Sequence, residues 1–204
     1  MAKDRYFYFN KIEQFKGLKG TVTIVGLQSG GIVLAEILAR AGINLRLIDK
    51  GRVYLEELQS QSLYLEEDVT KFKAKQAKKR LETINENPKI KAFHEELTAD
   101  TAYLLDSDIV LDFTNNKKTN EIVHDYCLKA EIPCLFVHSS ATTSTVTLLD
   151  GKDIKSKFKH SDEEELGILG SNSYFSAGAL SFLVYQKLSG QKLKDSYTFS
   201  LDQL

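Results

Sequence analysis

Residues 21–49 constrain the fold of this chain more than any other stretch, because they read as strand, tight loop, helix and second strand in direct succession. Residues 22–25 are a short β-branched run, which is typical of a buried strand. A helix is expected next, since apolar residues recur on one face with a period of about 3.6 residues, at Val33, Leu34, Ile37, Leu38 and Ala41. Gly42 is placed to end this helix, and residues 45–48 form the second strand.

The loop of this unit and the acid that follows it indicate a nucleotide site. The loop reads Gly26-Leu27-Gln28-Ser29-Gly30-Gly31, and Asp49 falls about twenty residues beyond the first glycine. In a Rossmann-type unit the loop amides and the helix N-terminus meet phosphate, and the acid meets the ribose hydroxyls. Gln28 stands where G-x-G-x-x-G has its second glycine. The spacing therefore favours nucleotide-binding ancestry more strongly than present-day nucleotide binding.

The rest of the chain alternates between further strands and helices. Strands are expected at residues 89–93, 109–113, 134–137, 146–149 and 197–201, and helices at about 70–85 (capped by Asp68), 118–130 and 174–188. We expect a short amphipathic lead-in at 1–20, packed on a neighbouring element or a partner subunit, and a charged surface loop at 152–165. The alternation predicts an α/β fold with a mainly parallel, Rossmann-like sheet, helices on both faces and last strands that are free to be antiparallel. A single domain over residues 1–204 is expected, with its nucleotide-binding half at about 20–115.

Composition removes several classes of function. A net charge of −1 gives no electrostatic case for nucleic acid or a membrane surface. The longest apolar runs fall short of the roughly 18 residues of a membrane span, and the N-terminus lacks a signal-peptide core. Two cysteines cannot build a disulfide framework or a four-thiolate zinc site. A reducing, cytoplasmic location is therefore expected, and no metal site is predicted.

The reactive side chains of the second half are expected to be structural. Cys127 falls on a predicted helix and Cys134 opens a predicted strand, so both are expected in the core. His138, Ser139 and Ser140 begin a polar run, residues 138–144, at a predicted strand end. Adjacent residues of an extended segment point to opposite faces, so these side chains are expected to line a ligand rim or to satisfy strand ends rather than to form a nucleophile–base pair.

Four stretches of the chain carry a resemblance to a known family. In order they read VGLQSGGIVLAEILARAGINLRLID, LQSQSLYLEEDVTKFKAKQA, SDIVLDFTNN and GALSFLVYQKLSGQKLKDSYTFSL. Together they resemble the ThiF/MoeB superfamily, the adenylation domains of ubiquitin-activating enzymes. The resemblance implies a protein that binds ATP and magnesium and adenylates the C-terminal glycine of a ubiquitin-like or sulfur-carrier protein. It also implies assembly with a homologous subunit, as a homodimer or a heterodimer.

Several positions of the family's nucleotide site are retained. Asp49 matches the ribose acid, Lys73 the phosphate lysine, and Gly26 and Gly31 two of the loop glycines, while Gln28 replaces a third. The resemblance thus implies a set of nucleotide-contacting residues: Gly26, Gln28, Gly30, Gly31, Asp49 and Lys73. Lys73 and Asn115 stand at positions that are catalytic in the family.

Other positions depart from the family, and those at the nucleotide site all weaken the binding of phosphate or magnesium. The family's loop asparagine becomes Glu57, its arginine becomes Ser60, and the magnesium carboxylate of its T-D-N motif becomes Asn115. Near the N-terminus, Tyr8 replaces the second arginine of R-Y-x-R. One unit charge about 5 Å from a phosphate is worth on the order of 3 kcal/mol at an effective dielectric constant near 20. Magnesium also prefers anionic oxygen ligands, so both ATP and its metal lose favourable contacts.

The departures resemble the non-catalytic adenylation half of eukaryotic ubiquitin-activating enzymes. They predict a degenerate subunit that pairs with an active homologue. A divergent but active adenylyltransferase is the first alternative, and a nicotinamide-dependent oxidoreductase on the same fold is the second.

Overall fold

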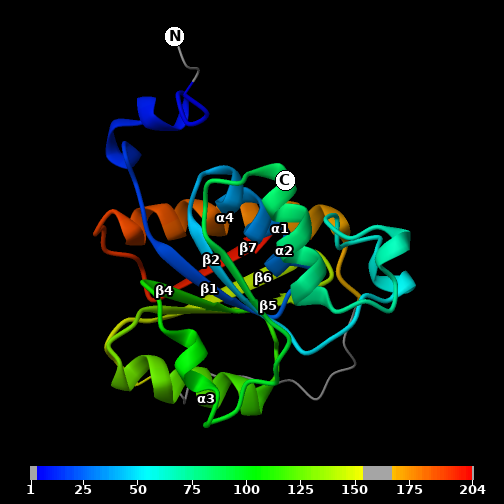
Figure 1. Ribbon diagram of the computed structural model, residues 1–204. Helices are drawn as coiled ribbons and strands as arrows, with labels where there is room; N and C mark the ends of the chain where they lie inside the picture. Colours follow the sequence, from blue (N-terminus) through cyan, green and yellow to red (C-terminus); the bar gives the residue numbers. More distant parts are fainter. Residues whose placement is uncertain (1–3, 154–166, 204) are drawn as a thin grey trace.

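The computed structural model describes residues 4–153 and 167–203, which build a seven-stranded sheet with helices on both faces (Figure 1). The strands are β1 (Thr21–Val25), β2 (Asn44–Ile48), β3 (Ile90–Phe93), β4 (Ile109–Asp112), β5 (Cys134–Ser140), β6 (Thr143–Leu149) and β7 (Ser196–Ser200). The α-helices are α1 (Ser29–Arg40), α2 (Lys73–Ile84), α3 (Lys117–Lys129) and α4 (Gly170–Leu188). The strand order is β3-β2-β1-β4-β5-β6-β7. The first five strands in this order are parallel, whereas β6 pairs antiparallel with β5 and β7 pairs antiparallel with β6. The predicted fold class is confirmed.

The order in which the chain adds strands reverses at β1: β2 and β3 lie on one side of it, and β4 and the later strands lie on the other. β1 pairs with β2 on one side and with β4 on the other, so the loops that follow β1 and β4 leave the sheet side by side. Backbone hydrogen bonds tie these strand ends together: the Phe113 N–H donates to the Val25 carbonyl at 2.8 Å, and the Gly26 N–H donates to the Ile48 carbonyl at 3.0 Å. Ligands of open α/β sheets bind at such a switch point.

Alternating strand residues bury the two faces of the sheet under different helices. On β1, Val22 and Ile24 belong to a core shared with α1, α2 and α4, whereas Val25 belongs to a second core with α3. Figure 1 shows α1, α2 and α4 on one side of the sheet and α3 on the other. Cys127 and Cys134 both lie in the α3 core, which confirms their predicted burial. Burial raises the pKa of the Cys134 thiol well above its usual value.

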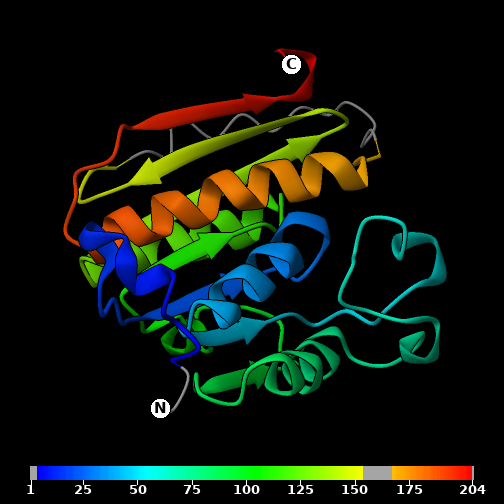
Figure 2. The same ribbon diagram turned by 90° about the horizontal axis from the view of Figure 1, so that it is seen from above.

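The N-terminal segment packs against α4 of its own chain. It contains the short 3-10 helices η1 (Phe9–Lys11) and η2 (Glu13–Phe15). Phe15 is buried, with its ring centroid 5.8 Å from that of Phe182 and 5.6 Å from that of Tyr185 on α4. In Figure 2 the segment lies across the end of α4 where the helix finishes. The predicted lead-in is thus placed on a neighbouring element.

Helix α2 begins at Lys73, three residues later than predicted, and the prediction of Asp68 as its cap is wrong. Phe72 occupies the N-cap position. The Asp68 carboxylate instead accepts hydrogen bonds from Arg80, at 3.0 and 3.3 Å, and from the Leu65 N–H at 3.1 Å. Between these positions Thr70 has a φ of 71°, which turns the chain before the helix starts. The buried ion pair, rather than a cap, fixes Asp68.

The polar run at residues 138–144, expected at a strand end, forms a β-hairpin. β5 continues to Ser140 and pairs in antiparallel register with β6, and Ala141 makes the turn with a φ of 45°.

Helix α4 begins earlier than predicted, at Gly170, because its polar first turns are buried and bonded: the Ser176 hydroxyl donates to the Asn172 carbonyl at 2.6 Å. Most of the charged loop predicted at 152–165 lies outside the described residues. Within the described part of the chain, no helix is long and apolar enough to span a membrane.

Replacing Asp68 with asparagine is expected to destabilise the fold by about 2 kcal/mol at pH 7. Burial raises the pKa of this carboxyl group, but hydrogen bonds from Arg80, Leu65 and Lys71 outweigh burial and lower it. A group whose folded pKa is lowered stabilises the fold above its unfolded pKa of about 3.9, and this contribution is lost as the pH falls through the folded value. Urea unfolding between pH 2 and pH 7 should therefore show a shallower acid decline for Asp68→Asn than for the wild type. The matched control is the neighbouring exposed residue Glu66, because Glu66→Gln removes one charge beside the Asp68–Arg80 pair and should keep the acid decline; equal declines in all three proteins would contradict the assignment.

Candidate functional site

The glycine loop between β1 and α1 is shaped by close backbone approach. Gly26 has a φ of 86°, and a Cβ atom there would lie 3.2 Å from the backbone of Phe113. A Cβ atom on Gly31 would lie 2.2 Å from the Gly26 carbonyl oxygen, so only glycine fits between loop and helix. Gln28 is the N-cap residue of α1 and is exposed, without a side-chain capping bond. The loop has the predicted form, and its glycines are explained by packing whether or not a nucleotide binds.

Asp49 lies at the end of β2 and is bonded to the glycine loop. One carboxylate oxygen accepts from the Leu27 N–H at 2.7 Å, and the other accepts from the Gly51 N–H at 2.6 Å. A carboxylate offers about four acceptor positions, so two remain available to hydroxyl donors. Asp49 is half-buried. The acid is therefore oriented as a ribose-binding residue would be, by bonds to the loop that would hold the phosphates.

Lys73, at the start of α2, is almost fully buried and paired with Glu57. Its side chain is 3% exposed, and its Nζ lies 2.8 Å from each carboxylate oxygen of Glu57. A Cβ atom on Gly51 would lie 2.9 Å from Asp49 and 3.7 Å from the Lys73 side chain, which places the lysine stem beside the ribose acid. Lys73 thus lies near Asp49, and its charge is paired with that of Glu57.

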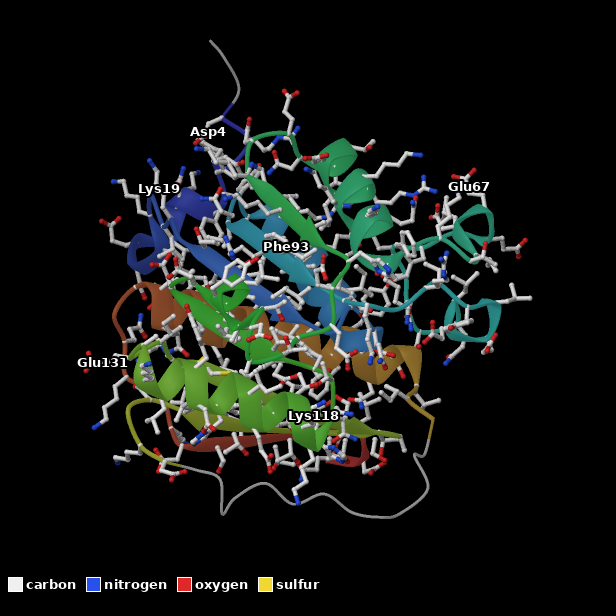
Figure 3. The ribbon with its side chains drawn as sticks, turned by 60° about the horizontal axis from the view of Figure 1, so that its bottom comes forward. Asp4, Lys19, Glu67, Phe93, Lys118 and Glu131 are labelled. Carbon is white, nitrogen blue, oxygen red and sulfur yellow. The ribbon has the colours of Figure 1, made fainter. Side chains whose placement is uncertain are left out.

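The loop that carries Glu57 folds back against the start of α1. It runs from Lys50 to Phe72 and includes the 3-10 helices η3 (Leu55–Glu57) and η4 (Glu66–Asp68). The hydroxyls of Ser60 and Ser29 are 3.1 Å apart, and both side chains are buried. Figure 3 shows Glu67 at the outer end of this loop and Phe93 at the end of β3. The loop therefore covers the glycine loop from the side of α2.

Tyr64 lies beneath both loops, a position that the sequence did not predict. Its hydroxyl is placed to donate to the Leu27 carbonyl at 3.3 Å and to the Lys73 carbonyl at 3.4 Å. Burial, and then the negative charges of Asp49, Glu57 and Asp68, raise its pKa well above the usual value. Tyr64 stays a neutral donor and holds the two loops together. The only sequence signal was a tyrosine between two leucines, Leu63 and Leu65, in a segment rich in Glu, Gln and Ser.

The end of β4 presents amides rather than a free carboxylate. Asn115 has a φ of 47°, and its side-chain oxygen accepts from the Nδ1–H of His138 at 2.6 Å. Asp112 is fully buried and accepts from the Thr114 N–H at 2.8 Å, the Thr114 hydroxyl at 2.7 Å and the Asn120 amide at 2.8 Å. Burial raises the pKa of Asp112 in spite of these bonds. The described residues contain no group of three or more His, Cys, Asp or Glu side chains able to hold a metal ion.

The side chains that follow Val137 have two different roles, one at the rim of the site and one within the hairpin. His138 lies at the rim, as expected, and contacts Asn115. The Ser139 hydroxyl instead bonds Ser144 across the hairpin at 2.7 Å. Thus the structure brings Gly26, Gly31, Asp49 and Lys73 to one edge of the sheet, next to the end of β4, and it adds Glu57, Tyr64 and His138 as their partners.

Comparison with known proteins identifies relatives over most of this chain. The ThiF family model matches residues 8–192. The sulfur carrier protein ThiS adenylyltransferase of Bacillus subtilis is 35% identical over 141 residues, which are 65% of this chain and 42% of that protein. The molybdopterin-synthase adenylyltransferase of Escherichia coli is 34% identical over 132 residues, 63% of this chain and 52% of that protein. The chain thus spans about half the length of these curated relatives.

Solved structures share the fold over nearly the whole chain. The crystal structure of selenomethionine PaaA has a TM-score of 0.76 and 26% identity, and the match covers 96% of this chain and 64% of PaaA. The structure of E. coli MccB has a TM-score of 0.80 at 16% identity, covering 99% of this chain and 68% of MccB. MccB solved with ATP gives 0.78 at 18% identity, covering 98% of this chain and 69% of MccB. At these identities the MccB structures are evidence for the fold alone.

Proposed function

Because this chain belongs to the ThiF family, we propose that it is a component of a system that adenylates a sulfur-carrier or ubiquitin-like protein, and that it acts as the non-catalytic partner of a homologous, active subunit. The relatives named as adenylyltransferases support the reaction class. The family match gives no support to the nicotinamide alternative.

The main support for the non-catalytic role is that residue 115, just after β4, is an amide and not a carboxylate. Adenylation joins a carboxylate to the α-phosphate of ATP and releases pyrophosphate, so charge on the phosphates must be offset by cations. The resemblance places a magnesium-binding carboxylate at residue 115, where this chain has an amide bonded to His138. Asp112, three residues earlier, is enclosed by Thr114 and Asn120 and is not free to bind a metal in its place.

Pairing with a homologous subunit is supported by exposed aromatic side chains. Tyr8 is 82% exposed on the N-terminal segment, near Phe7, and Phe182 is exposed on α4 where it contacts Phe15. Contiguous exposed apolar surface commonly marks a protein interaction site. We propose that Phe7 and Tyr8 on the N-terminal segment and Phe182 on α4 contact the partner subunit.

The test is ATP–pyrophosphate exchange with a carrier protein that ends in glycine. The chain alone is expected to give no exchange above a blank reaction. The same chain should co-purify with a ThiF-family subunit that retains T-D-N, and that complex should catalyse exchange. Exchange by this chain alone, dependent on magnesium, would overturn the non-catalytic role and establish the active alternative, which Asp49 and Lys73 favour.

Replacing Asn115 with aspartate is expected to make Mg-ATP stabilise the chain. An added anionic oxygen at the end of β4 gives magnesium a ligand of the kind it prefers. A gain of about 1 kcal/mol in binding at millimolar Mg-ATP should raise the Tm by about 2–4 °C relative to Mg-free ATP. Asn116→Asp is the matched control, since it adds the same charge one residue away and keeps the N-cap acceptor of α3. If Mg-ATP stabilises both variants equally, residue 115 is not the position of the lost metal ligand.

A further inference from the structure

We propose that Glu57 is an internal anion that occupies Lys73 in place of a phosphate group, so that the chain's own loop closes its phosphate site. The inference rests on the proposed function in one respect, namely that the site between Gly26 and Lys73 descends from a nucleotide site. It goes further because it assigns the closed state to one residue and makes that state reversible by one substitution.

The contacts of Lys73 are those of a cation that is already bound. Its Nζ is 2.8 Å from both oxygens of Glu57, and its side chain is 3% exposed while that of Glu57 is 25% exposed. The carboxylate therefore lies between the buried lysine and solvent. An anion arriving from solution would have to displace Glu57 to reach Lys73.

The loop is built to hold Glu57 in this position. The Tyr54 N–H donates to the Glu57 carboxylate at 3.3 Å, closing a turn around it. Two residues further on, the Gln59 side-chain amide donates to the Ile168 carbonyl at 3.3 Å, next to the start of α4. The Ser60 hydroxyl bonds both Ser29 on α1 and the Glu57 carbonyl, at 3.1 and 3.3 Å. A long side chain at position 60 could not make this short link, so the serine and the glutamate act together.

The local charge balance also opposes an incoming phosphate. Asp49 and Glu57 both lie beside Lys73, so these three side chains carry a net negative charge. Changing Glu57 to glutamine makes that sum neutral and leaves an oxygen to accept from Lys73 and Tyr54. The change removes the charge without removing the hydrogen bonds, which separates competition with phosphate from a purely structural role.

The experiment is calorimetry with pyrophosphate and with ATP, both free of magnesium and without any carrier protein or partner subunit. The wild-type chain is compared with Glu57→Gln, with the neighbouring exposed control Glu56→Gln, and with the double variant Glu57→Gln/Lys73→Gln. Glu57→Gln should bind both anions at least about tenfold more tightly than the wild type, a change equivalent to about 1.4 kcal/mol. Glu56→Gln, which changes the net charge equally, should match the wild type, and the double variant should lose the gain.

Equal affinities in the wild type and Glu57→Gln would overturn the proposal, as would a gain that survives in the double variant. If Glu57→Gln does not fold, Glu57→Asn removes the same charge with a shorter side chain and must show the same gain. These outcomes are separate from those of the exchange assay. Exchange by the wild-type chain would overturn the non-catalytic role, whereas equal anion affinities would overturn only the role of Glu57.

Discussion

Replacing Gly31 with alanine is expected to lower the free energy of unfolding by about 3 kcal/mol, because the new Cβ atom would meet a backbone atom that cannot move alone. That Cβ would lie 2.2 Å from the Gly26 carbonyl oxygen, so relief requires the glycine loop to separate from α1. For a chain of this length such a loss corresponds to a fall in Tm of about 6–12 °C. Thermal unfolding followed by circular dichroism measures it directly.

The neighbouring glycine provides the matched control. A Cβ atom on Gly30 would lie 3.3 Å from the edge of the Phe113 ring, a side-chain contact much less severe than 2.2 Å from a backbone atom. Alanine is also the better helix former by about 1 kcal/mol, so Gly30→Ala should leave stability within about 1 kcal/mol of the wild type. If Gly31→Ala were as stable as Gly30→Ala, the close contact between loop and helix would be disproved.

Replacing Glu57 with alanine is expected to destabilise the chain by about 3 kcal/mol at pH 7, because it leaves the charge of Lys73 buried and unpaired. The Lys73 side chain is 3% exposed and pairs with both Glu57 oxygens. Urea unfolding should show the loss as a lower midpoint at an unchanged slope. Glu56→Ala, on the exposed neighbour in the same short helix, should cost much less.

A double-mutant cycle separates the ion pair from the packing of the loop. In the Lys73→Met background the change of Glu57 to alanine should cost much less, because no buried cation remains to be compensated. Equal costs in the two backgrounds would mean that Glu57 stabilises the loop by some contact other than Lys73. That result would also remove the basis for its role as an internal anion.

The fold was predictable where local patterns and burial agree. Strands β1 and β2 were placed within a residue of their observed bounds, and Gly42 was correctly placed after the helix between them, whereas α1 begins at Ser29, inside the predicted loop. Errors came where a distant contact overrides a local preference. Asp68 resembled a helix cap but pairs with Arg80, twelve residues away, and the helix predicted from residue 174 begins at Gly170, with a buried polar first turn.

For the candidate site, the sequence could predict where residues lie but not which contacts they make. Asp49, Lys73 and Asn115 were expected near one another, and the structure places their elements at one edge of the sheet. The sequence could not show that Lys73 bonds Glu57, sixteen residues away, or that His138 bonds Asn115, because such contacts depend on loop conformation. Ala141 in a left-handed turn was equally unpredictable, since alanine rarely adopts that conformation.

The central claim is that the phosphate site of this chain is closed when the chain is alone. Two paired residues carry that claim: Lys73 is held by Glu57, and Asn115 is held by His138. Titration calorimetry of the wild-type chain with Mg-ATP tests it most directly. We expect no saturable binding with ATP in the hundreds of micromolar, whereas a micromolar Kd would show that the site is open and contradict this claim.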